Sequence, residues 1–352
     1  MANPPPPSSP LDTVLRDAIS DSPRGLHWAS FLELALYHGE HGYYRRPRPI
    51  GKRGDFFTSV SVGRCFGLLL ARHLRRRWEQ WGKPTPFHIV EQGAHHGALA
   101  LDILEEWPEA PYSIIEPSHL LQKAQTQAFR EAGKQSSLSH YTSPSDLPSD
   151  RATLFLANEL IDAFPVHRLT MTEQGWLERY ITLREDAFVE ELASPSSPLP
   201  PWLPEHLPPG FVLEWSPAVD DWFAALSRAL SAPSSLLLID YGLTREERFT
   251  AGRKEGTLRG YRQHQLTDRF FDHLGDTDLT WHIDFTQLAD LCHSHGWTMA
   301  EFTTQGQFLT KVATPWLQSL EGQADHPLIP QFQTLIHPGM MGKAFQVMQM
   351  DR

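Results

Sequence analysis

The chain has 352 residues, of which 40% are hydrophobic and 21% are charged, and it includes 11 Trp and 19 Phe residues. This length and composition exclude a peptide-sized module and a disordered chain, and they predict a packed fold. The formal net charge of −11 argues against a broad nucleic-acid footprint, which needs clustered Lys and Arg side chains.

The N-terminal region is predicted to be mainly helical. Residues 1–10 are mostly Pro and Ser, which is typical of a mobile tail and lacks the pattern of a signal peptide. Apolar residues at helical spacing then predict helices over residues 11–19 and 28–36, with no strand before them. Residues 38–58 are rich in Gly, Arg, Tyr and Pro, and they predict a long ordered loop that binds a ligand.

A third helix is predicted over residues 63–81, and it contains the densest basic run of the chain. This run, Arg72 to Arg77, alternates with apolar residues at helical spacing. The pattern favours the solvated side of an amphipathic helix, with a nucleic-acid patch as the alternative. We therefore expect no nucleic-acid partner.

The cysteine content and hydropathy indicate where the protein is found. Cys65 and Cys292, both in predicted helices, give neither a disulfide framework nor four zinc ligands. No apolar stretch is long enough to cross a bilayer, so we expect no membrane insertion. Together with the lack of a signal pattern, these features predict a cytoplasmic location.

From residue 83 onward, apolar strands and amphipathic helices alternate. The predicted strands cover 87–91, 112–116, 153–157 and 236–239, and the predicted helices cover 99–107, 120–132 and 217–230. Near-continuous apolar strands that end in polar residues need helices on both faces of a parallel sheet. The sequence therefore predicts a doubly wound, Rossmann-like α/β fold, closed by a pair of strands over 299–304 and 344–350.

Two stretches interrupt this alternation. Residues 171–210 are dense in Pro and Ser, and residues 244–285 are polar and rich in His, Asp and Arg. We interpret both as insertions that cover the active-site edge of the sheet. The predicted organisation is a tail over 1–10, a helical region with a covering loop over 11–82, and a main domain over 83–352.

The first strand-to-helix turn of the sheet, Glu91 to Gly97, is the candidate ligand site. In doubly wound sheets, ligands bind beyond the carboxyl ends of the strands. Gly93 permits a tight turn and a close approach of the backbone, and Gly97 opens the next helix near its positive N-terminus. Glu116 ends the next predicted strand, where a carboxylate accepts both ribose hydroxyls of an adenosine without a 2′-phosphate.

These residues also have simpler explanations. The two glycines serve turn geometry in many proteins, and Glu116 is then a solvated strand end. NAD is a competing cofactor, but its fingerprint requires three glycines at a different spacing. By itself the pattern supports a turn that suits a phosphate or an adenosine, leaves the simpler explanations open, and disfavours a nicotinamide enzyme.

Sequence motifs spread in order along nearly the whole chain carry a more specific signal. They are HGEHGYY at 38–44, GDFFTS at 54–59, FG at 66–67, EQGAHHGAL at 91–99, ANELIDAFPV at 157–166, DYG at 240–242, GTLR at 256–259, His264, DF at 284–285 and TQGQFL at 304–309. This series resembles the MidA-like family of class I methyltransferases, which includes the mitochondrial arginine methyltransferase used in assembling respiratory complex I.

The resemblance implies S-adenosylmethionine as cofactor and a protein arginine, in a subunit of a respiratory complex for example, as methyl acceptor. The cofactor residues implied by the family motifs and by the strand ends are Gly54, Thr58, Glu91, Gly93, His95, Gly97 and Glu116. Two positions depart from the family pattern. His95 stands at the middle glycine of the turn, and Val60-Ser61 replaces the family's Pro-Glu, which bears on cofactor pose and on substrate.

The segment after the third predicted strand is the candidate acceptor site. Methyl transfer is an in-line displacement at a sulfonium carbon, so the enzyme chiefly aligns donor and acceptor. A guanidinium acceptor is held by carboxylates and carbonyl groups. We hypothesise that Glu159 and Asp162 orient the acceptor, while Asn158 fixes the turn or contacts the cofactor. The alternative is a helix N-terminus that Asn158 caps and the two acids favour through the helix dipole.

Other polar residues allow further interpretations. Asp240, Arg259 and His264 are candidates for a second acid/base group, although Arg259 can equally brace its own loop. The chain has 18 His residues, and His282 and Asp284 lie on one predicted strand face, but no run has zinc-like spacing and no metal is predicted. Two functions compete with protein arginine methylation. They are methylation of a small molecule, and a non-catalytic assembly or binding factor with a degenerate cofactor site.

Overall fold

The protein is described from a computed structural model that covers residues 9–45, 58–263, 265–323 and 325–352. The chain forms two compact units, each assembled from three separate segments. The accessory unit comprises Met1–Phe56, Ala163–Asp220 and Arg245–His282, and the parallel-sheet unit comprises Phe57–Asp162, Asp221–Thr244 and Ile283–Arg352. The domain ranges 1–10, 11–82 and 83–352 stay predictions. So does the covering role of the insertions over 171–210 and 244–285, since it concerns how the two units are arranged.

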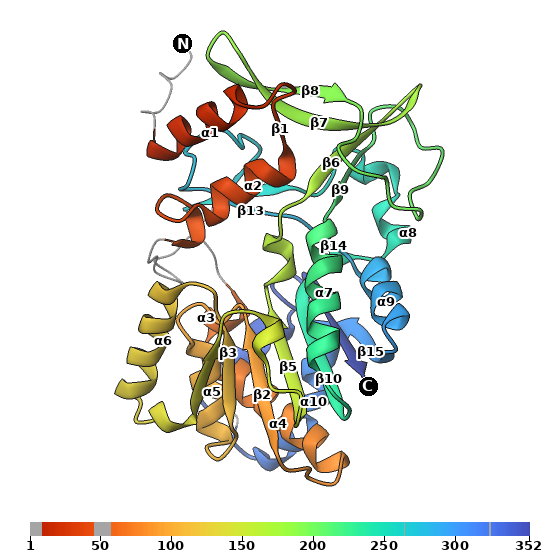
Figure 1. The fold of residues 1–352 in the computed structure, drawn as a ribbon. Coiled ribbons are helices and arrows are strands. Elements are labelled where there is room, and N and C mark those ends of the chain that lie inside the picture. The colour runs from red at the N-terminus through yellow and green to blue at the C-terminus, as the bar shows by residue number, and fades with distance from the viewer. Residues whose placement is uncertain (1–8, 46–57, 264, 324) are drawn as a thin grey trace. The chain divides into compact units, whose positions relative to one another are not determined.

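An eight-stranded sheet forms the centre of the parallel-sheet unit (Figure 1). Its strands are β2 (Phe87–Gln92), β3 (Tyr112–Ile115), β4 (Leu138–Tyr141), β5 (Ala152–Asn158), β10 (Ser234–Leu243), β14 (Ile283–Asp284), β15 (Thr298–Thr304) and β16 (Phe345–Asp351). Their order is β15-β16-β10-β5-β2-β3-β4, with β14 beside β10. Strands β4, β3, β2, β5 and β10 pair in parallel, whereas β16 is antiparallel to β10 and to β15. The predicted doubly wound sheet and its closing pair are confirmed.

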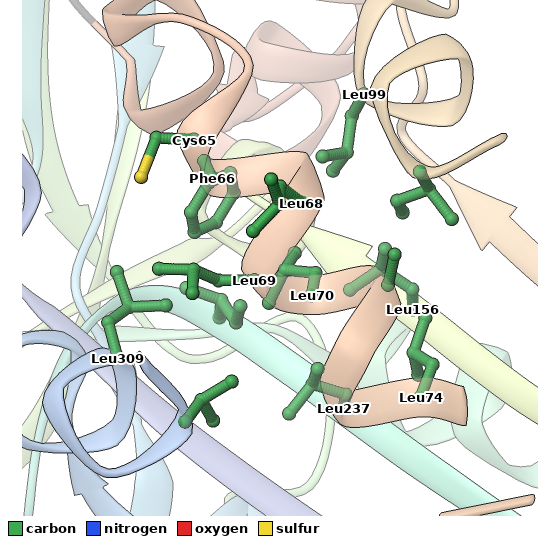
Figure 2. Packing of buried hydrophobic residues seen from close by; sticks show 14 of the residues in the cluster. Cys65, Phe66, Leu68, Leu69, Leu70, Leu74, Leu99, Leu156, Leu237 and Leu309 are labelled. Carbon is green, nitrogen blue, oxygen red and sulfur yellow. The ribbon is translucent and has the colours of Figure 1, made fainter. Parts of the chain in front are cut away.

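Helices cover both faces of this sheet. They are α3 (Ser59–Val62), α4 (Cys65–Gln80), α5 (Ala98–Glu106), α6 (His119–Glu131), α7 (Pro217–Ala229), α9 (Phe285–Ser294), α10 (Gln305–Ser319) and α11 (Ile329–Ile336), with short 3₁₀ turns η2 (Gln135–Ser137), η3 (Pro144–Asp146) and η4 (Ile161–Ala163). On one face, α4 packs its apolar side chains between α5, α10 and the strands, as Leu156 and Leu237 show (Figure 2). The alternate residue Phe155 contacts Trp222 of α7 on the other face.

The basic run of α4 lies on the solvated side of the helix, as its spacing predicts. Arg72 pairs with Glu106 at 2.7 Å, and Arg75 pairs with Glu109 at 3.4 Å. Cys65 and Cys292 are both buried and free. Among the helices that the structure describes, none combines the length and the apolar character of a membrane span.

The accessory unit contains two smaller antiparallel sheets. The five-stranded sheet has β8 (Ala187–Ala193) beside β7, in the order β1 (Leu26–His27), β7 (Gly175–Arg184), β6 (His167–Thr172) and β9 (Val212–Trp215). The other sheet has the order β12 (Gln265–Thr267), β11 (Arg259–Arg262) and β13 (Asp278–Thr280). The helices are α1 (Pro10–Ser20), α2 (Trp28–Tyr37) and α8 (Arg245–Arg248), with 3₁₀ turns η1 (Tyr43–Arg45) and η5 (Ala251–Arg253).

One expectation about this region is wrong. Strand β1 lies between α1 and α2, where no strand was expected, because its two residues pair with β7, more than 150 positions later in the chain. Residues 171–210, which the sequence predicts to be an insertion, contain β7 and β8. These strands have mixed polar and apolar faces, so they lack the continuous apolar run of a buried parallel strand.

Candidate functional site

The turn after β2 has a backbone that suits a bound ligand. The N–H of Gly97 donates to the carbonyl of Ala94 at 2.7 Å and closes a four-residue turn. Within and beside it, Gly93, His95 and Gly97 have φ angles of +85°, +46° and +82°. This is the left-handed region that glycine adopts at little cost and that His adopts rarely. The predicted glycine turn is therefore present, with His95 held in a conformation that favours glycine.

Neighbouring segments pack directly on this turn. A Cβ atom added to Gly93 would lie 3.4 Å from Leu160, and one added to Gly97 would lie 3.3 Å from the ring of Phe129. The first contact brings the turn against the segment that follows β5, and the second brings it against α6. Two regions that the sequence singled out separately are therefore adjacent at one edge of the sheet.

Glu91 lies beneath the turn rather than at an open strand end. Its carboxylate accepts a hydrogen bond of 2.7 Å from the hydroxyl of Tyr112, and both side chains are buried. Burial raises the pKa of Glu91 to about 7, and the bond from Tyr112 opposes this shift. Gln92, the last residue of β2, accepts a bond of 2.9 Å from the indole of Trp222.

Glu116 follows the last residue of β3, at the strand end where the sequence places it. It is buried, and its Oε1 atom accepts a 2.7 Å bond from the backbone N–H of Ser118. Ser118 in turn caps α6, so the acid lies between a strand end and a helix N-terminus. This is the arrangement that a doubly wound fold uses for a ribose-binding acid.

The side chain of His95 carries an unusual feature. Burial lowers the pKa of its imidazole to about 4, with a further contribution from His96, so the ring is neutral at physiological pH. Its Nδ1 atom is buried and has no hydrogen-bond partner among the residues described. A buried polar atom without a partner is uncommon and often marks a place where a ligand or water belongs.

The segment after β5 has similar features. The amide nitrogen of Asn158 donates to the Glu159 carboxylate at 3.0 Å, whereas the Oδ1 atom of Asn158 is buried with no partner among the described residues. Glu159 has a φ of +52°, which is rare for a residue with a side chain. Strained backbone and orphaned polar atoms cluster at functional sites, so both observations suit a binding role.

Asp240 holds this segment in place. Its Oδ2 atom accepts backbone N–H bonds from Leu160 at 3.1 Å, Ile161 at 2.8 Å and Asp162 at 3.4 Å. Its Oδ1 atom accepts from Tyr241 at 2.8 Å. Burial raises the pKa of Asp240, and these backbone hydrogen bonds oppose the shift.

The position of Asp240 bears on the predicted capping role of Asn158 and on the predicted end of the strand before Asp240. The amides at the start of η4 are capped by Asp240, so the alternative in which Asn158 caps a helix does not describe this segment. Asp240 also lies inside β10, which runs past the predicted end at residue 239. Its carboxylate is therefore engaged by backbone amides. In the sequence, Asp240 is recognisable only as an acid that follows a buried apolar strand.

The remaining predicted residues are placed as follows. Gly54 and His264 lie outside the described residues. Thr58 caps α3, where its hydroxyl accepts a 3.1 Å bond from the N–H of Ser61. Arg259 donates to the carbonyl of Leu258 at 2.7 Å, within its own loop.

One group among the described residues has the composition of a metal site. The potential ligand atoms of His27, His167 and Glu178 lie within 4.8 Å of one another. These atoms already have partners, since His167 bonds Glu178 at 2.6 Å and the Nδ1 atom of His27 accepts from Ser30 at 3.1 Å. Hydrogen bonding explains the cluster, and we assign no metal to it.

Known proteins match this chain over most of its length. The family model of S-adenosyl-L-methionine-dependent methyltransferases matches residues 69–303, well over half of the chain. A Drosophila melanogaster protein named mitochondrial protein arginine methyltransferase NDUFAF7 homolog is 28% identical over 92% of this chain and 80% of its own length. The human protein arginine methyltransferase NDUFAF7, also named as mitochondrial, is 26% identical over 90% of this chain and 78% of its own.

A solved structure has the same fold. A Burkholderia thailandensis protein, crystallised with S-adenosyl-homocysteine bound, superposes with a TM-score of 0.86 at 23% sequence identity. The match covers 99% of this chain and 95% of the other. At this identity the similarity establishes the fold, and it agrees with the sheet order described above.

The relatives correct one expectation. The curated relatives named above are mitochondrial proteins, which overturns the cytoplasmic location expected from the sequence. That expectation depended on the cysteine content, on the lack of long apolar stretches and on the lack of a secretory signal pattern. None of these properties distinguishes the cytoplasm from another reducing compartment.

Proposed function

Because the chain belongs to the family of S-adenosyl-L-methionine-dependent methyltransferases, we propose that it methylates an arginine side chain of a protein. The observation that carries the proposal is the proximity of the turn after β2 to the segment after β5, where a Cβ atom added to Gly93 would lie 3.4 Å from Leu160. This proximity brings the candidate cofactor residues beside the candidate acceptor residues. The relatives named as protein arginine methyltransferases support the choice of acceptor.

In this proposal the cofactor binds along the turn from Glu91 to Gly97 and at Glu116. The cofactor supplies an electrophilic methyl group on a sulfonium. Gly93 is exposed and leaves room for close approach to the backbone, while Glu116 binds the ribose hydroxyls. The unpartnered Nδ1 atom of His95 fits a site that is completed by a polar ligand or by water. Thr58 and Gly54 remain candidate contacts from the implied family motif.

The acceptor site in this proposal consists of Asn158, Glu159 and Asp162. Two carboxylates suit a guanidinium group, because they hold its N–H groups and stabilise its positive charge before transfer. Glu159 has a left-handed φ, and Asp240 fixes the residues that follow it. Positioning of this kind is the main contribution that a methyltransferase makes to an in-line displacement.

Labelled-methyl transfer tests the acceptor class. The protein is incubated with methyl-labelled S-adenosylmethionine and a lysate, and the protein fraction is hydrolysed and analysed for methylarginine. We expect label in methylarginine, and at least about tenfold less with Glu159→Gln, which keeps the shape of the side chain but removes its charge. Label found only in the small-molecule fraction would contradict the proposal.

The resemblance also suggests a finer acceptor, a subunit of a respiratory complex. Purified respiratory complexes offered as substrates test this suggestion directly. Incorporation into one subunit, with none into an unrelated arginine-rich protein, is the expected result. Equal labelling of both proteins would contradict this choice.

A further inference from the structure

Helix α6 contacts both candidate cofactor turns through two glutamine side chains. The Nε2 atom of Gln125 donates to the carbonyl of His95 at 2.7 Å, in the turn after β2. The Nε2 atom of Gln122 donates to the carbonyl of Glu116 at 2.6 Å, in the turn after β3. Residues three apart lie on the same face of a helix, so one face of α6 reaches both turns.

Gln125 is fully buried and its amide is fixed in direction. Its Oε1 atom lies 2.9 Å from the Nε2 atom of His140 on β4. Burial lowers the pKa of His140, which favours a neutral ring that donates one N–H. A neutral ring that donates from Nε2 holds the amide oxygen toward β4 and the amide N–H₂ toward His95. A reversed amide would bring its oxygen against the carbonyl of His95.

The turn needs such a partner because of its conformation. His95 has a φ of +46°, which residues with a side chain rarely adopt without support from their surroundings. Gln125 binds the carbonyl of this same residue, and Phe129, one turn further along α6, contacts the position of a Cβ on Gly97. The helix therefore supports the turn at two of its residues.

We propose that Gln122 and Gln125 are positioning residues that hold the two cofactor turns in register, and that Gln125 keeps His95 in its left-handed conformation. This proposal depends on the proposed function, in which the cofactor binds at both turns. Both glutamines act on backbone carbonyls and contact the cofactor only through the turns that they hold.

A double-mutant cycle tests this role. Calorimetry with S-adenosyl-homocysteine measures binding to the wild type, Gln125→Leu, His95→Gly and the double variant. We expect Gln125→Leu to weaken binding about tenfold, because the carbonyl of His95 loses the donor that holds this residue at its positive φ. In the His95→Gly background we expect the same change to cost less than about threefold, because glycine adopts a positive φ unaided. Gln127→Leu is the control, since Gln127 is exposed on α6 and its side-chain bonds in the structure described go to Glu131 and Arg130 of the same helix rather than to either turn.

The outcomes separate this inference from its premise. If the wild type fails to bind S-adenosyl-homocysteine, the proposed cofactor site is wrong and this inference is wrong with it. If the wild type binds but Gln125→Leu weakens binding equally in both backgrounds, the link to His95 is wrong. If Gln125→Leu unfolds, the test uses Gln122→Met instead, because Gln122 is only half-buried. An unchanged affinity of Gln122→Met for S-adenosyl-homocysteine would contradict the proposed role of this face of α6.

Discussion

The two strand-end segments of the candidate site are held by different means. The turn after β2 depends on its own backbone, with Gly93 and Gly97 at positive φ and α6 packed against it. The segment after β5 depends on one carboxylate, because Asp240 accepts the N–H groups of three consecutive residues. The turn after β2 is therefore sensitive to side-chain volume. The segment after β5 is instead sensitive to the loss of a single side chain from a neighbouring strand.

Removal of the Asp240 side chain is expected to have the largest effect. Asp240→Ala removes the acceptor of four backbone N–H groups, two of them in buried hydrogen bonds and two in part-buried ones, and we expect a loss of about 4 kcal/mol in the free energy of unfolding. Denaturant unfolding measures this loss. Asp240→Asn keeps one oxygen acceptor and should lose less, and the exposed Asp325→Ala should unfold like the wild type. Equal stability of Asp240→Ala and wild type would show that the segment after β5 is held in another way.

Glu91, which lies beneath the turn after β2, makes the free energy of unfolding depend on pH. Its pKa is raised by burial from 4.5 to about 7, so the folded state binds this proton more tightly than the unfolded state. The free energy of unfolding should therefore fall as the pH rises from about 4.5 to about 7, by on the order of 3 kcal/mol for this group, and level off above.

Glu91→Gln isolates this contribution. The variant keeps a hydrogen-bonding oxygen for Tyr112 but does not titrate, so its stability should fall less than that of the wild type over the same pH range. The raised pKa of Asp240 acts in the same direction in both proteins and cancels in the comparison. Parallel pH profiles would contradict a raised pKa at Glu91.

Much of this site could be predicted from the sequence because the signals were local. Each apolar strand lies within a few residues of the glycine or acid that marks its end. Parallel strands place their carboxyl ends at one edge, so these local signals also predict which segments meet there. The position of Glu116 directly after β3 agrees with that reasoning.

The rest depended on contacts between distant parts of the chain. Asp240 holds Leu160 across 80 positions of sequence, and nothing in either local pattern indicates this pairing. Likewise, the burial of Glu91 beside Tyr112 and the left-handed φ of His95 follow from tertiary packing. Local spacing predicts which residues gather at the edge, and packing decides which of them point into it.

A methyl group added at Gly97 tests how much side-chain volume the turn after β2 can accept. Gly97→Ala combines an unfavourable positive φ with a contact of 3.3 Å to Phe129, and we expect a loss of about 2 kcal/mol in stability. Gly133→Ala is the matched control, because Gly133 has a φ of +68° with no atom within 4 Å of the added Cβ. The excess loss at Gly97, measured by thermal unfolding, reports the contact alone. Equal losses at both positions would mean that α6 does not limit the turn.

The smallest expected effect distinguishes two neighbouring histidines in the same turn. His95 has a positive φ and His96 does not, so glycine relieves strain at the first position and only adds chain entropy to the unfolded state at the second. We expect His95→Gly to be more stable than His96→Gly by about 1 kcal/mol, measured by denaturant unfolding. The two rings contact each other at 4.0 Å between centroids, so either variant loses that same contact and the difference reports the backbone. If His96→Gly were the more stable protein, side-chain packing would outweigh backbone strain in this turn, and its shape would depend on the imidazole of His95 rather than on its φ.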